Sequence, residues 1–140
     1  MSIEIDGIGD LTTTLDNLGK VGQKVGKKAI KEGLKIALEQ QKKDAPRDTG
    51  ESRDNLMIQY VKSNNHGSAW GACGIGTKNW ESTKSLWFQN YGYENHGLNF
   101  SGQKITTHVG WMDKVMKQVE SKSRKVILDT LKSEIDKVLK

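Results

Sequence analysis

The N-terminal third of the chain shows two patterns of apolar and polar positions. Residues 2–6 alternate between polar and apolar side chains and lead into a glycine, which predicts a short strand that ends in a turn. Asp10 can cap a following helix, and apolar residues then recur at helical spacing from Leu11 to about Lys43. Because Pro46 disfavours a helical conformation at the residue before it, we expect the helix to end there.

The next segment predicts a β-hairpin. Residues 47–54 are typical of a loop, and over 55–62 the residues Leu56, Ile58 and Tyr60 alternate with Met57, Gln59 and Val61. Residues 70–76 are a second, glycine-rich strand candidate, and 63–68 contain the asparagine and glycine residues of a turn between the two. A hairpin is the simplest interpretation of this order.

The region after the hairpin carries weaker signals. Residues 77–84 are polar and indicate a loop, and the aromatic segment 86–92 fits either a helical turn or a strand. Residues 94–102 indicate a flexible excursion, and the pattern over 104–109 predicts a last strand.

The C-terminal segment gives the clearest helical pattern. From Trp111 onward apolar residues form a stripe with charged residues opposite, interrupted at Ser123. The elements together predict an α+β fold, in which a small antiparallel sheet packs against a long N-terminal helix and this long amphipathic helix. A chain of 140 residues is the size of one domain, so we assign residues 1–140 to a single domain with parts 1–44, 45–109 and 110–140.

Small residues in the N-terminal helix allow two interpretations. Each interior glycine disfavours a helix, and we expect a break or kink near Gly19. Gly22, Gly26, Gly33 and Ala37 lie close to one helical face, so they could form a smooth strip against which another backbone packs. The alternative is weak helix propensity that tertiary packing tolerates.

Composition suggests a thin core and an acidic partner. Apolar residues make up only 34% of the chain, so burial of further apolar surface in an oligomer would add stability. The net charge is +5, and Lys24, Lys28 and Lys31 are part of a basic helix face that could meet DNA or an acidic protein, or could simply be solvated. No run of apolar residues is long enough to span a membrane, and the single Cys73 with no secretion signal favours a reducing cytoplasm.

No residue pattern indicates catalysis, a cofactor or a metal. The three histidines lack ligand spacing, and Cys73 is expected to be a small buried residue. Residues 71–78 superficially resemble a phosphate-binding loop, but the threonine precedes the lysine and no helix pattern follows. The aromatic residues around Trp87 and Phe88, interleaved with lysines, could serve the core, an interface or stacking on single-stranded nucleic acid.

The segment 45–56, which reads Ala-Pro-Arg-Asp-Thr-Gly-Glu-Ser-Arg-Asp-Asn-Leu, follows directly after the basic helix. It resembles the Pro-x-Asp-Thr-Gly turn and following strand of the HK97 gp10-like family of tailed-phage proteins, although Ser52 and Asn55 depart from the family pattern. The early strand, the glycine-rich strand, the aromatic segment and the final helix occur in the family's order. Asp48 or Thr49 can accept hydrogen bonds in a tight turn, and Gly50 can take a positive φ.

The resemblance implies a virion role without catalysis. Members of this family resemble tail-completion and head–tail joining components that form rings in the neck, so the implied partners are copies of the chain, other neck, head-completion and tail proteins, and the passing genomic DNA. The interface candidates are Asp48, Thr49, Gly50, Arg53 and Asp54 in the turn, and Trp87, Phe88 and Tyr91 in the aromatic segment. The rival hypothesis is a small basic cytoplasmic module that binds nucleic acid.

Overall fold

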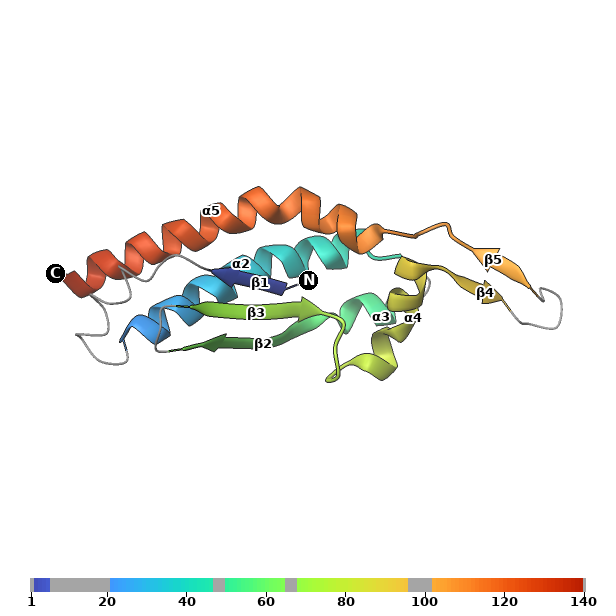
Figure 1. Ribbon diagram of the computed structural model, residues 1–140, viewed down its shortest axis with the longest axis horizontal. Helices are drawn as coiled ribbons and strands as arrows, with labels where there is room; N and C mark the ends of the chain where they lie inside the picture. Colours follow the sequence, from blue (N-terminus) through green and yellow to red (C-terminus); the bar gives the residue numbers. More distant parts are fainter. Residues whose placement is uncertain (1, 6–20, 47–49, 65–67, 96–101, 140) are drawn as a thin grey trace.

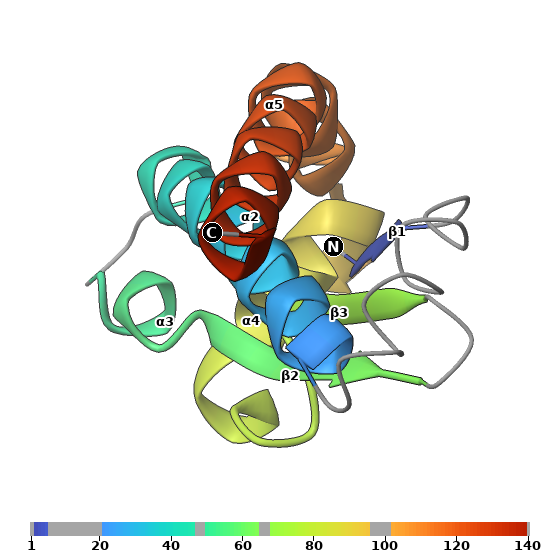
Figure 2. The same cartoon turned by 90° about the vertical axis from the view of Figure 1, so that its left-hand side faces the viewer.

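The computed structural model describes residues 2–5, 21–46, 50–64, 68–95 and 102–139, and it has three layers. A three-stranded sheet forms one side, the helix α2 (Val21–Asp44) lies in the middle, and the helix α5 (Trp111–Leu139) covers the opposite side of α2 (Figures 1 and 2). The predicted α+β class, with a small antiparallel sheet and two long helices, is confirmed. The predicted helical residues before Val21, and the break expected near Gly19, lie outside the described residues.

The sheet contains the predicted strand and hairpin. The strands β1 (Ser2–Ile5) and β2 (Met57–Ser63) pair antiparallel with the central strand β3 (Ala69–Gly74). The β2–β3 register shifts between Ile58 and Tyr60, which is the irregularity of a β-bulge. All three predicted strands and the predicted hairpin pairing are therefore confirmed, and the edges of the sheet are β1 and β2.

The small residues of α2 serve the predicted close packing. A Cβ atom at Gly26 would lie 3.1 Å from the Ala69 Cβ on β3, and one at Gly33 would lie 2.7 Å from the Ile127 side chain on α5. Ser123 Oγ also donates a hydrogen bond of 3.1 Å to the Gly33 carbonyl. The glycines thus let α2 approach the sheet at Gly26 and α5 at Gly33. They serve close packing as predicted, but against two different neighbours and not along one strip.

The helix α5 is continuous where its apolar stripe was expected to be interrupted. Ser123 is buried and faces α2, so the polar residue that interrupts the stripe takes part in the contact between the two helices through its hydroxyl. The main core joins α2, β3 and α5 through ten buried residues: Val25, Ala29, Ile30, Leu34, Ala37, Ala69, Cys73, Val119, Ile127 and Leu131.

Four sequence predictions are wrong in detail. The expected loop at 47–54 contains the one-turn helix α3 (Glu51–Asp54), and the expected loop at 77–84 contains the first turn of the helix α4 (Trp80–Tyr91). The excursion at 94–102 begins inside the strand β4 (Tyr93–Asn95), which pairs with β5 (Gln103–Ile105). The predicted last strand at 104–109 ends at Ile105, because residues 106–110 adopt a turn. In this turn the Val109 N–H donates a 3.2 Å hydrogen bond to the Thr106 carbonyl.

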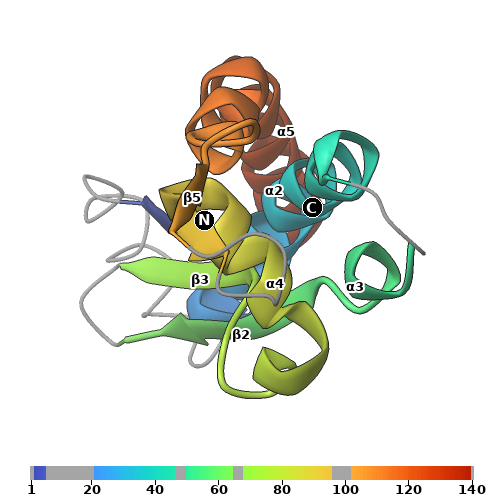
Figure 3. The ribbon, with the colours of Figure 1, turned by 90° about the vertical axis from the view of Figure 1, so that its right-hand side faces the viewer.

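A second apolar cluster holds α4 against the three layers. Its buried members are Ala45, Leu56, Leu86, Trp111 and Val115, which come from the residue after α2, the segment before β2, α4 and the start of α5. Figure 3 views the molecule from this end, with α3 beside α4. The helix α4 is thus fixed at one end of the sheet.

Candidate functional site

The outer surface of α4 carries a cluster of four aromatic side chains, which we call the aromatic face: Trp80, Trp87, Phe88 and Tyr91. Trp87, Phe88 and Tyr91 follow Trp80 by seven, eight and eleven residues, so all four lie on one side of the helix. Their exposed fractions are 36%, 37%, 42% and 63%, respectively. The sequence-predicted residues Trp87, Phe88 and Tyr91 therefore lie together, and none of them belongs to either of the two buried clusters formed by the described residues.

The rings of the aromatic face support one another. The ring centroids of Trp87 and Phe88 are 5.4 Å apart, those of Trp80 and Trp87 are 5.9 Å apart, and both pairs are edge-to-face. The Trp87 and Tyr91 centroids lie 4.6 Å apart in a tilted arrangement. Such pairs are favourable beyond their burial, so the surface is ordered before any partner arrives.

The opposite side of α4 is buried although it is mostly polar. Leu86 packs in the second cluster, and its carbonyl accepts a 3.0 Å hydrogen bond from Trp111 Nε1. Asn90 accepts a 3.0 Å bond at Oδ1 from the Met112 N–H and a 2.9 Å bond at its carbonyl from the Gly110 N–H. These bonds fix the C-terminal half of α4 to the start of α5.

The N-terminal end of α4 is fixed by one buried asparagine. Asn79 Nδ2 donates to the carbonyls of Asn55 at 2.7 Å and Gly74 at 2.8 Å. Its Oδ1 accepts from Gln59 Nε2 at 3.0 Å and from the Gly76 N–H at 2.9 Å. Because all four bonds reach the sheet or the segments that flank it, Asn79 sets the position of the aromatic face relative to the sheet.

The Thr-Gly turn leads into α3 beside α4. Asp48 and Thr49 lie outside the described residues, whereas Gly50 has φ of 86°, as its predicted positive φ required. Arg53 and Asp54 form an ion pair with each other at 3.1 Å. The hydroxyls of Ser52 and Ser85 lie 3.1 Å apart, which brings the turn segment against the helix that carries the aromatic face.

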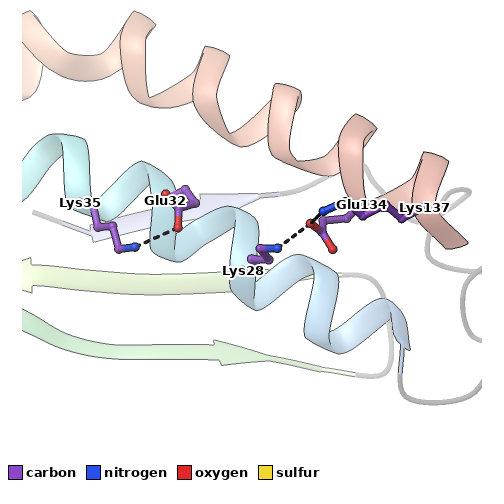
Figure 4. Close-up of polar contacts among 5 residues, drawn as sticks. All are labelled: Lys28, Glu32, Lys35, Glu134 and Lys137. Atoms are coloured by element: carbon purple, nitrogen blue, oxygen red, sulfur yellow. Dashed lines mark hydrogen bonds and ion pairs between the residues drawn. The ribbon is translucent and has the colours of Figure 1, made fainter.

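The predicted lysine face lies on the exposed side of α2, and one of its lysines forms an ion pair with a residue of α5. Lys24, Lys28 and Lys31 are all exposed. Lys28 Nζ lies 2.6 Å from a Glu134 carboxylate oxygen on α5, and Lys137 lies 3.2 Å from the same oxygen, as Figure 4 shows beside the Lys35–Glu32 pair. Hydrogen bonds from Lys28 and Lys137 lower the pKa of the Glu134 carboxyl below its ordinary value.

The next question is whether the described residues include an activated thiol or a cluster of metal-ligand side chains. Cys73 is buried, and burial raises the pKa of its thiol to about 11, so it is not activated as a nucleophile. Across the ranges that the structure describes, no three His, Cys, Asp or Glu side chains lie together as a metal site would require. None of the helices in those ranges combines the length and apolar character needed to cross a lipid bilayer.

The spacing of the aromatic residues in the sequence indicates the aromatic face, although the polar residues around Trp80 favour a loop. Trp80 falls in the segment 77–84, whose polar pattern predicts a loop, so the sequence prediction of an interface contains only Trp87, Phe88 and Tyr91. Its separation from them by seven, eight and eleven residues is the spacing of one helical side. Asn79 carried no comparable signal, because its partners come from distant parts of the chain.

The fold and this surface define a class of small α+β proteins that present an exposed, ordered aromatic surface, the kind of surface that protein interfaces use. A family model described as "Bacteriophage HK97-gp10, putative tail-component" matches residues 9–92, which is more than half of the chain. The chain therefore belongs to the HK97 gp10-like family, as the resemblance at 45–56 predicted. Neither the curated proteins nor the solved structures include a significant match to the chain. Membership identifies a bacteriophage structural protein of the tail-component type, whose neighbours are other phage structural proteins.

Proposed function

We propose that the protein is a non-enzymatic neck or tail-completion component, which joins the phage head to the tail as an oligomeric ring. The observation that carries this proposal is the exposed aromatic face of α4. Large aromatic side chains that remain in contact with water are costly, and they become favourable once a partner covers them. The partners in this proposal are copies of the chain and other neck, head-completion and tail proteins.

The hydrogen bonds that hold α4 in place favour a role in assembly over a role in catalysis. Asn79 fixes one end of α4 and Asn90 fixes the other, so the helix does not need to move to accept a ligand. A rigid aromatic surface loses little conformational entropy when it binds, which suits a permanent structural contact.

The test of this proposal is the solution mass of the protein, measured by light scattering over a concentration series. The protein is measured alone and with the head and tail proteins that flank it in the virion. We expect a defined ring, alone or once a flanking protein is added. A monomer under all of these conditions would contradict the proposal.

The second candidate function is a basic module that binds nucleic acid, favoured by the net charge of +5 and the exposed lysines of α2. A protein that neutralises several phosphates loses affinity steeply as salt rises. The charge-reversal pair Lys24→Glu and Lys31→Glu tests this lysine face. Lys28 is left unchanged, because its substitution would also break the ion pair with Glu134. Tight, salt-dependent DNA binding by a monomer, lost in this double variant, would favour the second candidate over the ring.

The same double variant tests whether the lysine face meets the genomic DNA inside a ring. If it does, virions assembled with the variant retain their DNA less well than virions assembled with the wild-type protein. Unchanged assembly and unchanged DNA retention would exclude this orientation of the lysine face.

A further inference from the structure

The strand β2 lies at an edge of the sheet and leaves main-chain groups unpaired there. The Asn64 N–H donates a 3.0 Å hydrogen bond to the Ser68 carbonyl, and the Tyr60 carbonyl oxygen lies against β3. Successive residues of an antiparallel strand direct their N–H and C=O groups to alternate sides, so those of Val61 and Ser63 point away from β3. Among the described strands, none pairs with β2 on that side, which we call the β2 edge.

The β2 edge lacks, across residues 60–63, the features that keep a further strand away. Such features include a β-bulge, a proline and a charged side chain that projects across the edge. The bulge of β2 lies before Tyr60, and residues 60–63 contain no proline. The Lys62 ammonium lies 5.2 Å from the centroid of the Tyr60 ring, which places it over the face of the sheet and not across its edge. The β2 edge is therefore open to a further strand.

The hairpin formed by β4 and β5, which we call the arm, also lacks a third strand. It extends beyond the body of the molecule at the end where α4 lies (Figure 1), and its two strands have their main contacts with each other. A two-stranded hairpin is only marginally stable in water, and a third strand or a packed face is needed to stabilise it. The arm therefore needs a surface that the described part of its own chain does not supply.

The base of the arm is fixed to the body and directs the arm away from its own β2 edge. The Gly110 N–H donates a 2.9 Å hydrogen bond to the Asn90 carbonyl, so the chain leaves the body and returns at the same point. Gly92 has φ of 82°, and a Cβ there would lie 3.3 Å from the Ile105 carbonyl oxygen. The arm extends from α4, whereas β2 runs from α3 in the opposite direction (Figure 1). A second copy can supply the edge that the arm of the first copy does not reach in its own chain.

We infer that the arm of one copy adds to the β2 edge of the next copy. This inference rests on the proposed function, because it names a contact that would build the ring. The unpaired N–H and C=O groups of a strand edge are satisfied by another strand, so the arm and the β2 edge each supply what the other needs. The two surfaces differ, so the contact is heterologous and repeats head to tail until the rotation closes a ring. The matched family segment ends at Gly92, so the arm lies beyond what the family model covers.

Two variants and their mixture test the inference. Ser63→Pro removes an outward N–H from the β2 edge and leaves the arm, and an edge strand tolerates proline where the N–H faces outward. The arm deletion replaces residues 93–108 with a short Gly-Ser linker and leaves the β2 edge. Each variant alone is expected to have a self-dissociation constant raised by about tenfold or more, because main-chain hydrogen bonds supply the affinity of an added strand. A 1:1 mixture restores one intact contact and is expected to form a heterodimer in sedimentation experiments.

A matched control separates the lost N–H from the lost serine side chain. Ser63→Ala removes the hydroxyl and keeps the N–H. The hydroxyl is buried without a hydrogen-bond partner among the described residues, so this variant is expected to self-associate like the wild-type protein. Circular dichroism checks that every variant keeps its helices. In an NMR titration of the labelled arm deletion with unlabelled Ser63→Pro protein, the Val61 and Ser63 amides are expected to shift and those of β1 to stay unchanged.

Several results would overturn the inference. These are a mixture that forms no heterodimer, a Ser63→Pro protein that self-associates like wild type, and a Ser63→Ala protein that does not. Normal self-association of the arm deletion would also overturn it and, together with a loss in Ser63→Pro, would show that the β2 edge pairs with the β2 of a second copy.

A failure here is distinguishable from a failure of the proposed function. If the arm deletion joins heads to tails as well as the wild-type protein does, this contact is rejected and the joining role stands. A wild-type protein that stays monomeric, both alone and with the flanking virion proteins, would contradict the inference and the proposed ring together.

Discussion

Asn79 determines the position of an exposed surface although its own side chain is buried. Its amide joins the segment before β2, the end of β3 and the side chain of Gln59. In the sequence it is one polar residue in a polar stretch. Only the fold brings its partners together, so its role could not be predicted from spacing.

Asn79→Ala is expected to lower the free energy of unfolding by about 2 kcal/mol or more, because buried groups lose their hydrogen-bond partners. Urea denaturation followed by circular dichroism measures the change. Asn55→Ala is the matched control, since that exposed amide makes a single 2.9 Å bond to the Glu51 carbonyl and its loss should cost no more than about 1 kcal/mol. Equal costs for the two variants would contradict the role assigned to Asn79.

Gly71 is required by the close approach of β3 to α2. A Cβ at this position would lie 2.7 Å from the Tyr60 carbonyl oxygen and 2.7 Å from a methyl carbon of Leu34. We therefore expect Gly71→Ala to destabilise the fold by about 1–3 kcal/mol, as overpacking does, in thermal or urea denaturation. Ala72→Ser, one residue along at a half-buried position, should stay within about 0.5 kcal/mol of wild type. A Gly71→Ala protein as stable as wild type would show that the two layers are not closely packed there.

The ion pair between Lys28 and Glu134 links α2 to α5 and makes stability depend on pH. A carboxyl whose pKa is lowered in the folded state stabilises the fold at every pH above its ordinary pKa of 4.5. This contribution is lost as the pH falls through the lowered pKa of the folded state. Lys28→Gln should raise the pKa of Glu134 toward 4.5 in an NMR titration and reduce the loss of stability in acid. Lys35→Gln, which breaks the separate pair with Glu32, should leave the Glu134 titration unchanged.

At the scale of elements, hydrophobic periodicity does not predict the full length of the helix α4. Its buried side consists of Thr83, Leu86 and Asn90, of which only one is apolar, and its aromatic residues face water. The usual signal for a helix is an apolar stripe that faces the core, and here that stripe is reversed. The strands of the hairpin and the stripe of α5 follow the usual rule, so their positions could be predicted.

The aromatic face should be necessary for assembly and dispensable for folding. The double variant Trp87→Ala and Phe88→Ala removes exposed rings, so we expect the helical signal to be retained and only the favourable ring pairs, about 0.5–1.5 kcal/mol each, to be lost. Its binding to copies of the chain or to flanking virion proteins should be lost in the light-scattering series. Met116→Ala, which truncates an exposed side chain on α5, is expected to bind like wild type. Normal assembly by the double variant would exclude the aromatic face as the interface.

At the scale of the whole molecule, the packing of the three layers depends on the glycines of α2, whose role the sequence alone does not decide. The glycines of α2 fitted either weak helix propensity or a packing strip, and only the contacts of Gly26 with β3 and Gly33 with α5 decide between them. The α+β class and the family could be predicted, because the strands, the final helix and the segment 45–56 each carry a local pattern. The rigid support of α4 could not, because it is made of long-range hydrogen bonds.

The central claim is that this protein joins heads to tails, and an in vitro joining assay tests it most directly. Heads and tails are prepared from the phage lacking this gene, the purified protein is added, and joined particles are counted by electron microscopy. We predict that heads and tails stay separate until the wild-type protein is added and then join. Heads and tails that join equally often with and without the protein would contradict the claim.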